Sequence, residues 1–196
     1  MSKTVTIIDT FGFFFRSFYA LPQHLKNSEG FPTGLLTGFT NFISTIQKQH
    51  DSDYIIFAID TKGDSFRSEI DPNYKAHRTP PPEELTMQLP IAIEWIDKMG
   101  YKTLGHVGYE ADDMIATVVH FAKEKGYNVR VVSHDKDLFQ LIDDGKVVLV
   151  DAIKKQVMDE NACVLKYGVS PSQFIDYQAI IGDSADNIPG VKGIGE

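Results

Sequence analysis

The stretch Val5-Thr6-Ile7-Ile8-Asp9, residues 5–9, carries the signal that decides the fold. Its β-branched residues predict a buried strand, and this strand ends on a carboxylate. Two later apolar runs repeat the arrangement: residues 54–59 lead into Asp60, and residues 129–133 stop shortly before Asp135. The chain therefore places an acidic residue at the end of one strand after another.

Apolar residues at helical spacing separate these strands. We expect helices over residues 13–20, 35–49, 83–99, 110–124, 159–167 and 172–181, and further strands over 102–104 and 147–150. This alternation indicates an α/β fold with a mostly parallel central sheet flanked by helices. The polar segment 62–82 has no core pattern, so we expect it to form a mobile loop or arch.

The bulk composition indicates one domain, or one domain and a fragment of another. Of the 196 residues, 42% are hydrophobic, which is enough for a sizeable core. No apolar run approaches the ~20 residues that span a membrane, and no signal peptide is recognisable. The single cysteine, Cys163, cannot form an internal disulfide, which fits a reducing compartment. We expect a cytoplasmic monomer without membrane attachment.

The net charge of −8 argues weakly against a nucleic-acid partner, because such proteins usually carry a basic surface. Nine of the 27 acidic residues, however, belong to one proposed site. Two divalent cations at that site would bring the net charge to about −4. The local pattern therefore decides the function, and the total charge does not.

The proposed site consists of nine carboxylates that occur at predicted strand ends and helix starts. They are Asp9, Asp60, Glu110, Asp112, Asp113, Asp135, Asp137, Asp183 and Asp186. In an open α/β sheet, ligands bind at the carboxyl ends of the strands, where these side chains would meet. Crowded carboxylates repel one another, and hard divalent cations relieve the repulsion. Each acid alone also fits an ordinary turn or helix start, but together they predict a metal site.

A glycine-rich segment, residues 182–195, follows the last predicted helix. Its second half, Gly190-x-x-Gly193-x-Gly195, predicts a tight hairpin with exposed backbone N–H groups. Such groups can bind a phosphate without reading bases, although a plain glycine-rich turn is the alternative. The chain stops directly after this turn, where a helix would be expected next, so we expect a truncated form.

Together these motifs resemble the N-terminal 5′ nuclease domain of bacterial DNA polymerase I, in the flap endonuclease family. The resemblance is carried by Asp9, Ala58-Ile59-Asp60, Ser65-Phe66-Arg67, Tyr74-Lys75-Ala76-His77-Arg78, Glu110-Ala111-Asp112-Asp113, Ser133-His134-Asp135-Lys136-Asp137 and the segment 182–195. It implies a PIN-like fold, with a catalytic domain over residues 1–174. Residues 175–196 would then begin a helix–hairpin–helix that is truncated before its second helix. The family removes 5′ flaps and RNA primers by metal-dependent phosphodiester hydrolysis.

The resemblance also implies a role for each acid, with two divalent cations, Mg²⁺ or Mn²⁺, as cofactors. The first ion would be served by Asp9, Asp60, Glu110, Asp112 and Asp113. The second ion would be served by Asp135, Asp137, Asp183 and Asp186. A K⁺ ion at the hairpin is a further implied cofactor.

Positively charged side chains would hold the scissile phosphate. Lys75 and Arg78 are the predicted catalytic cations, since Arg offers a two-pronged donor and Lys a point charge. The predicted DNA contacts are Arg16, Arg67, Tyr74, Gly190, Lys192, Gly193 and Gly195. Tyr74 could stack on a base. Between Lys62 and Arg78 there are four Lys or Arg and three Asp or Glu, so composition alone favours a solvated loop with scattered charges, and the resemblance reverses this preference.

The implied partners are DNA with a 5′ flap or nick and an RNA primer on DNA. The sequence leaves open which ion is used, how exonuclease and endonuclease activity are balanced, and whether a polymerase domain follows in the full-length protein. Two other functions compete: a PIN-type RNA nuclease, and a non-catalytic DNA-binding module of the same fold. The second would be signalled by missing site carboxylates, and none is missing. A haloacid-dehalogenase-like phosphatase is excluded, because Asp9 is followed by Thr10 and Phe11 without the second Asp that such enzymes need.

Overall fold

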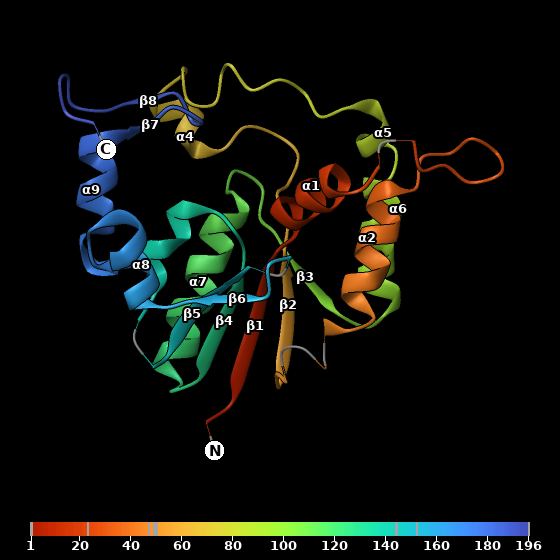
Figure 1. The fold of residues 1–196 in the computed structure, drawn as a ribbon, viewed down its shortest axis with the longest axis horizontal. Helices are drawn as coiled ribbons and strands as arrows, with labels where there is room; N and C mark the ends of the chain where they lie inside the picture. Colours follow the sequence, from red (N-terminus) through yellow and green to blue (C-terminus); the bar gives the residue numbers. More distant parts are fainter. Residues whose placement is uncertain are drawn as a thin grey trace.

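The computed structural model describes residues 2–22, 24–46, 48, 51–143, 145–151 and 153–195. Its centre is a six-stranded sheet in the order β3-β2-β1-β4-β5-β6 (Figure 1). The strands are β1 (Thr4–Asp9), β2 (Tyr54–Ala58), β3 (Lys102–Leu104), β4 (Asn128–Val132), β5 (Val147–Asp151) and β6 (Gln156–Met158). The first five pair in parallel, and β6 runs antiparallel to β5. The predicted α/β fold with a mostly parallel sheet is confirmed.

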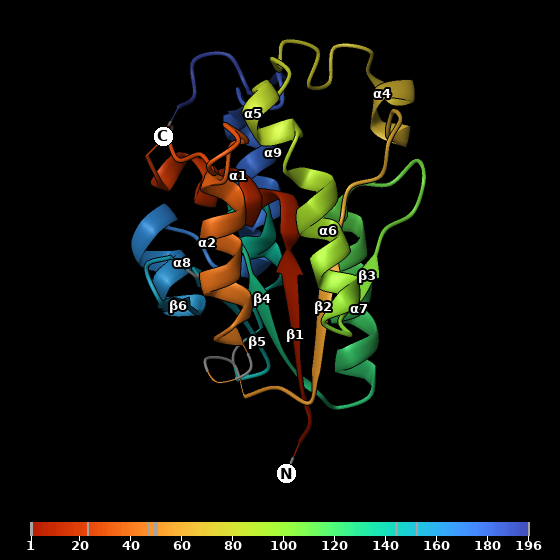
Figure 2. The same ribbon diagram turned by 90° about the vertical axis from the view of Figure 1, so that its right-hand side faces the viewer.

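Helices cover both faces of this sheet (Figures 1 and 2). The α-helices are α1 (Thr10–Ala20), α2 (Gly34–Ile43), α4 (Phe66–Ile70), α5 (Glu83–Thr86), α6 (Leu89–Lys98), α7 (Ala111–Glu124), α8 (Glu160–Tyr167) and α9 (Phe174–Ile181). Two 3₁₀ helices are η1 (Lys136–Leu141) and η2 (Pro171–Gln173). One hydrophobic core lies between the sheet and α7, α8, α9 and η1. The other lies between the sheet and α1, α2, α5 and α6.

The central strand β1 contributes to both cores. Side chains alternate along a strand, so Ile7 packs into the core beneath α7 and Ile8 into the core beneath α1 and α2. Both are completely buried, and each burial stabilises the fold by about 2 kcal/mol. β1 therefore holds Asp9, the residue at its end, in a fixed position.

The strand order reverses between β1 and β4. β2 and β3 extend the sheet on one side of this pair, and β5 and β6 extend it on the other. At such a point the chain segments that leave the carboxyl ends diverge, which leaves a cleft for a ligand. Asp9 ends β1, and Asp135 follows β4 after two residues, so both lie at this cleft.

Two predicted helices have different boundaries in the structure. The helix expected from residue 13 begins at Thr10, because the Asp9 side chain caps it by accepting a bond from Gly12 N at 3.0 Å. The helix expected over 35–49 is interrupted: α2 ends at Ile43, a turn follows at residues 44–45, and residues 46 and 48 are again helical. Residues 47 and 49 of that prediction lie outside the described part of the chain.

The helix expected over 83–99 is interrupted, and α5 and α6 are separate. Pro90 lies in the first turn of α6 and has no N–H to continue a helix from α5. At the break, the buried Gln88 side chain accepts a bond from Leu36 N at 3.2 Å and donates one to Glu84 O at 2.6 Å. The amide of Gln88 thus ties the break to α2.

The segment 62–82 crosses the carboxyl ends of the strands, in the upper part of Figure 1. We expected it to be irregular, but it contains the short helix α4. Its expected mobility stays a prediction. We call residues 62–82 the arch below. Sequence analysis also missed β6, the short antiparallel strand at the sheet edge. No helix of the described residues is long and apolar enough to cross a membrane.

The glycine-rich segment begins with a small hairpin of β7 (Gly182–Asp183) and β8 (Ile188–Pro189). Gly190 packs directly against the end of α9, and a methyl group on it would collide with the carbonyl oxygen of Ile181. Val191 N donates to Ile180 O at 2.7 Å and fixes this contact. Gly190 was predicted to contact phosphate, but its lack of a side chain has a packing reason. Gly195 has open space around it.

Replacing Gly190 with Ala is expected to open the hairpin, because the added methyl group has no room against backbone atoms that cannot move independently. We expect faster amide exchange over residues 182–191 and a melting temperature lowered by about 4 °C or more. Gly195→Ala is the matched control and should leave both unchanged. Equal behaviour of the two variants would show that the close contact at Gly190 is unimportant.

Candidate active site

A cavity of about 330 Å³ lies at the carboxyl ends of β1 and β4, below the arch. Eight of the nine predicted metal-binding acids line it: Asp9, Asp60, Glu110, Asp112, Asp135, Asp137, Asp183 and Asp186. Three cationic residues line it as well, namely Lys75, Arg78 and Lys136. The fold thus brings together side chains that are up to 177 residues apart, from Asp9 to Asp186.

Asp9 and Asp60 are held by neutral donors. The buried Asp9 carboxylate accepts a bond from Ser133 Oγ at 2.7 Å and from Gly12 N at 3.0 Å. Burial, opposed by these bonds and reinforced by nearby acids, raises the pKa of Asp9 to about 6. Asp60 accepts a bond from Ala111 N, at the start of α7, at 2.8 Å. Neither acid forms an ion pair with a cationic side chain of the described residues, so their charge is not compensated in that way.

Asp112, in the first turn of α7, is the most perturbed acid in the cavity. Burial first, and then the charges of Asp135 and Asp9, raise its pKa to about 8. Among the described residues, its side chain accepts no hydrogen bond and forms no ion pair. We define Asp9, Asp60, Asp112 and Asp135 as the first cluster. This differs from the sequence prediction in two ways: Asp135, assigned there to the second ion, is included because its charge acts on Asp9 and Asp112, and Glu110, assigned there to the first ion, is left out because it pairs with Lys75. A donor set of oxygens alone, with carboxylates strained by mutual repulsion, fits a hard divalent cation.

Asp137, Asp183 and Asp186 form the second cluster. One carboxylate oxygen of each lies within 4.8 Å of the others, which is the spacing of metal ligands, and no other group of three or more Asp, Glu, His or Cys residues in the described part of the chain is spaced this closely. The Asp135 side chain caps η1 by accepting a bond from Asp137 N at 2.9 Å. Burial, and the nearby charge of Asp135, raise the pKa of Asp137 to about 6, although Gln178 donates a bond to it.

Lys75 and Arg78, the predicted catalytic cations, reach into the cavity from the arch. Lys75 Nζ lies 2.7 Å from Glu110 Oε2 and 3.7 Å from Asp186 Oδ2. Arg78 forms an ion pair with Asp186. Burial opposes ionisation of Glu110, but Lys75 together with the hydroxyl groups of Ser65 and Tyr74 lowers the Glu110 pKa. Lys75 has a left-handed backbone with φ of 54°, an arrangement that is often found at functional sites.

Asp113 is the one predicted metal ligand that lies outside the cavity. Its carboxylate accepts two bonds from Arg67, each of 2.8 Å, and a bond from Glu110 N at 3.0 Å. The Arg67 bonds, which outweigh burial, lower the Asp113 pKa. The geometry therefore favours Asp113 as an anchor for the arch, through Arg67, and its role as a metal ligand stays an untested prediction.

The other predicted DNA contacts are also paired with acids. Arg16 Nη1 lies 2.8 Å from Asp151, and the Tyr74 hydroxyl donates to Glu110 at 3.0 Å. Lys192, Gly193 and Gly195 are exposed near the end of the chain. Nothing in this geometry tests their contact with DNA, which stays a prediction for all of them.

Sequence analysis assigned no role to Lys136, which lies between Asp135 and Asp137 at the start of η1. Its ammonium nitrogen is 3.1 Å from Asp183 Oδ1. Burial opposes the charge of Lys136, but the bond to Asp183 together with the charges of Asp183 and Asp137 raises the Lys136 pKa. The position of Lys136 between two predicted metal ligands could have indicated its role. Sequence spacing could not show which acid it meets.

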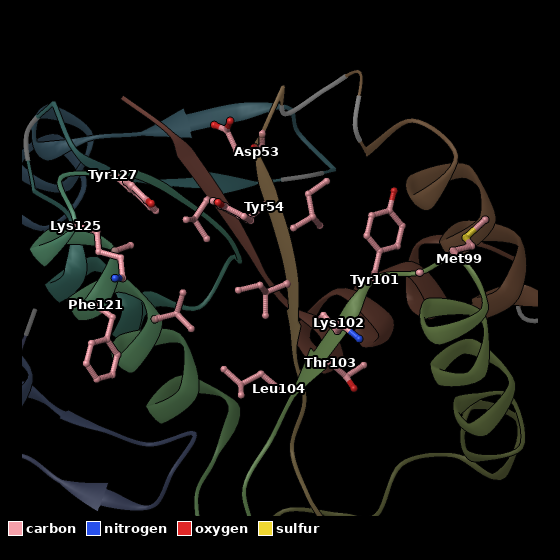
Figure 3. A pocket seen from close by; sticks show the side chains of 17 residues that line it. Asp53, Tyr54, Met99, Tyr101, Lys102, Thr103, Leu104, Phe121, Lys125 and Tyr127 are labelled. Atoms are coloured by element: carbon pink, nitrogen blue, oxygen red, sulfur yellow. The ribbon is translucent and has the colours of Figure 1, made fainter. Parts of the chain in front are cut away.

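A larger cavity, of about 740 Å³, lies at the far edge of the sheet beside β2, β3 and the second half of α7. Figure 3 shows Tyr54, Tyr101 and Phe121 around it. Its lining is mainly apolar, and Asp53 is the only acid among the lining residues. Of these two cavities, the smaller one is where carboxylates converge, and we place the chemistry there.

Residues 4–168 match the model of the family described as 5′-3′ exonuclease, N-terminal resolvase-like domain. The chain belongs to this family. It is 44% identical over 186 residues to DNA polymerase I of Helicobacter pylori strain J99, covering 93% of this chain and 20% of that protein. It is 36% identical over 193 residues to the 5′-3′ exonuclease of Aquifex aeolicus, covering 98% of this chain and 66% of that protein. The chain thus spans about a fifth of the first relative and less than two thirds of the second.

Two solved structures share the fold. The 5′-exonuclease of bacteriophage T5 with bound zinc has a TM-score of 0.79 and 27% identity, covering 98% of this chain and 72% of that chain. The T5 D15 flap endonuclease, in a pseudo-enzyme-product complex with DNA and metal ions, has a TM-score of 0.77 and 29% identity, covering 98% and 71%. These likenesses bear out the predicted PIN-like nuclease fold.

Proposed function

We propose that this chain is a metal-dependent, structure-specific 5′ nuclease, which hydrolyses phosphodiester bonds in 5′-flap DNA and RNA primers during replication and repair. The observation that carries the proposal is the convergence of eight carboxylates and three cationic side chains in one cavity at the carboxyl ends of β1 and β4. Membership of the 5′-3′ exonuclease family supports the reaction class.

In this proposal the acids hold two divalent cations, Mg²⁺ or Mn²⁺. The first cluster serves one ion and the second cluster the other. When bound, such ions activate a water molecule and stabilise the leaving oxygen. Metal ions in the two T5 structures support the choice of a divalent cation. Glu110 contributes by orienting Lys75 and Tyr74, both of which donate to its Oε2 atom.

Lys75 and Arg78 hold the scissile phosphate in this proposal. Both lie on the arch and reach the cavity, where their charges favour a phosphate close to the acids. The proposal further includes DNA with a 5′ flap or nick as substrate, a K⁺ ion near residues 190–195, and a polymerase domain in the longer protein. The polymerase relatives, of which this chain matches about a fifth, support the last of these. A monomer is proposed as the working form.

Lys75→Ala is expected to slow cleavage of flap DNA about a hundredfold, since it removes one charged donor to the phosphate. Affinity for Mn²⁺ should not fall, because an ammonium group is not a metal ligand. Single-turnover cleavage and isothermal titration with Mn²⁺ measure the two effects. Lys62→Ala, in the same segment but fully exposed, is the matched control. A large loss of Mn²⁺ binding in the Lys75 variant would contradict the assignment.

The experiment that tests the proposed function is cleavage of a labelled 5′-flap DNA with Mg²⁺, with Mn²⁺ and with excess EDTA. We expect release of the flap with either ion and none with EDTA. Undiminished cleavage in EDTA would refute the metal-dependent mechanism. Cleavage of single-stranded RNA in preference to the flap would favour the RNA nuclease, and binding without cleavage would favour the non-catalytic module.

A further inference from the structure

The two clusters of the cavity differ in how their charge is compensated. Within the described part of the chain, the hydrogen-bond donors to the first cluster are neutral: a serine hydroxyl and the backbone N–H groups of Gly12, Ala111 and Asp137. In the second cluster, by contrast, Asp183 forms an ion pair with Lys136, and Asp186 pairs with Arg78 and Lys75. Side-chain cations are therefore concentrated where the carboxylates are closest to one another.

This difference explains the spacing of the acids. Three carboxylates with oxygens within 4.8 Å of one another repel strongly unless positive charge lies between or beside them. Lys136 supplies such charge to Asp183, which is almost completely buried. The other two cations belong to the arch, so Lys136 is the cation that η1 itself brings to the second cluster.

We propose that Lys136 is a positioning residue of the second cluster: its ammonium group is the counter-ion of Asp183 in the metal-free protein, and a divalent cation that binds Asp137, Asp183 and Asp186 displaces it. Lys136 thereby lowers the affinity of the second cluster for a divalent cation. The inference rests on the proposed metal-binding role of these three acids.

The direction of the effect follows from charge. A divalent cation at the second cluster would lie close to the ammonium group of Lys136 and would be repelled by it. Lys136 also stabilises the metal-free carboxylates by neutralising Asp183. Both effects favour the metal-free state over the metal-bound state, so removal of the ammonium group must strengthen metal binding.

Lys136→Met tests this, because Met keeps most of the side-chain length and lacks the charge. Titration of the 196-residue chain with Mn²⁺, followed by calorimetry and by the electron paramagnetic resonance signal of free Mn²⁺, reports binding without any need for cleavage. We expect the weaker of two Mn²⁺ sites to bind about five- to tenfold more tightly in the variant. Lys136→Arg keeps the charge and should restore weak binding.

Two controls separate a local effect from a general one. Lys102→Met makes the same change of charge on the far edge strand β3, and it should leave Mn²⁺ affinity nearly unchanged. Asp183→Asn removes the acid that Lys136 meets, so Lys136→Met should have a clearly smaller effect in that background, where only the direct repulsion between Lys136 and the ion remains. Unchanged affinity in Lys136→Met, or an equal gain in Lys102→Met, would overturn the proposal.

If Lys136→Met does not fold, displacement of the Lys136 ammonium group by the ion can be measured on the protein without substitutions. Reductive methylation, read by mass spectrometry, compares the reactivity of the Lys136 amine with and without Mn²⁺. Displacement should increase that reactivity several-fold, while Lys102 stays constant. Unchanged or lower reactivity of Lys136 would sink the proposal. Mn²⁺ binding as expected without flap cleavage would instead count against the proposed function alone.

Discussion

Asp112→Asn is expected to reduce cleavage of 5′-flap DNA at least about a thousandfold under single-turnover conditions with saturating Mg²⁺. The substitution keeps the shape of the side chain and removes its charge. Asp112 lines the cavity among Asp9, Asp135 and Asp137, and its charge has no ion-pair partner among the described residues. A carboxylate held in that position is useful chiefly to a bound cation. Circular dichroism should show an intact fold.

Asp113→Asn is the matched control, because it makes the same change at the next residue of the same helix. Asp113 lies outside the cavity and binds Arg67 and Glu110 N. We expect a loss of only about tenfold, through a less well anchored arch. Equal losses in the two variants would contradict this distinction, and would restore Asp113 as a metal ligand, as the sequence predicted.

The contrast between Asp112 and Asp113 shows what the sequence could not specify. Adjacent residues on an α-helix point about 100° apart, and here Asp112 faces the cavity while Asp113 points toward Arg67. The motif Glu110-Ala111-Asp112-Asp113 marks both as candidates and carries no information on which direction the cavity takes. That direction depends on how α7 packs against β1. It also depends on the bond between Asp113 and Arg67, which are 46 residues apart in the sequence.

The strands were predictable because their signal is local. Continuous β-branched runs indicated β1, β2 and β4 to within a residue or two, and the alternation with helices indicated a parallel sheet. Since the carboxyl ends of parallel strands share one edge, the positions of Asp9, Asp60 and Asp135 followed from the fold class. Eight of the nine acids do meet there.

Element ends were less predictable where distant contacts fix them. Apolar residues continue at helical spacing across residues 83–99, and only Pro90 signals a break. The buried amide of Gln88, which holds the break, finds its partner in Leu36, 52 residues away. The strand β6 has three residues and depends on pairing with β5, so no periodic pattern could develop within it.

Counter-charges were the least predictable part of the site. The sequence shows that Lys75, Arg78 and Lys136 lie near acidic motifs, but it does not show which acid each one meets. In the structure all three pair with acids of the cavity. The cations of the arch thus compensate, in the metal-free protein, some of the charge that bound metal ions would compensate.

The same arrangement makes the metal-free protein sensitive to pH. Burial and neighbouring charges raise the pKa of Asp112 from its ordinary value near 4 to about 8. Between these values the folded protein keeps a proton on Asp112 that the unfolded chain releases. Stability therefore falls as the pH rises from about 4 to about 8, and the whole penalty is present above pH 8. Asp9 and Asp137, with pKa values of about 6, act in the same direction.

Asp112→Asn should consequently stabilise the metal-free protein, although it abolishes most of the activity. In EDTA at pH 8 we expect the free energy of unfolding to rise by a few kcal/mol, and the melting temperature by about 5 °C or more. At pH 4 the two proteins should melt nearly alike, because Asp112 is then protonated in the folded protein and about half protonated in the unfolded chain, so little of the penalty is present. Saturating Mg²⁺ should reverse the order, since the ion stabilises the wild-type protein by binding to it.

Asp113→Asn should shift the metal-free melting temperature in the opposite direction. It removes a carboxylate whose pKa is lowered by Arg67, so a favourable ion pair and a helix cap are lost. Thermal melting of wild type and both variants in EDTA, at pH 4 and pH 8, tests whether the two substitutions shift the melting temperature in opposite directions. A lower melting temperature for Asp112→Asn at pH 8 would mean that the charge of Asp112 stabilises the fold by itself. The crowded carboxylates of the first cluster would then have a structural role, and the case for a metal ion there would be lost.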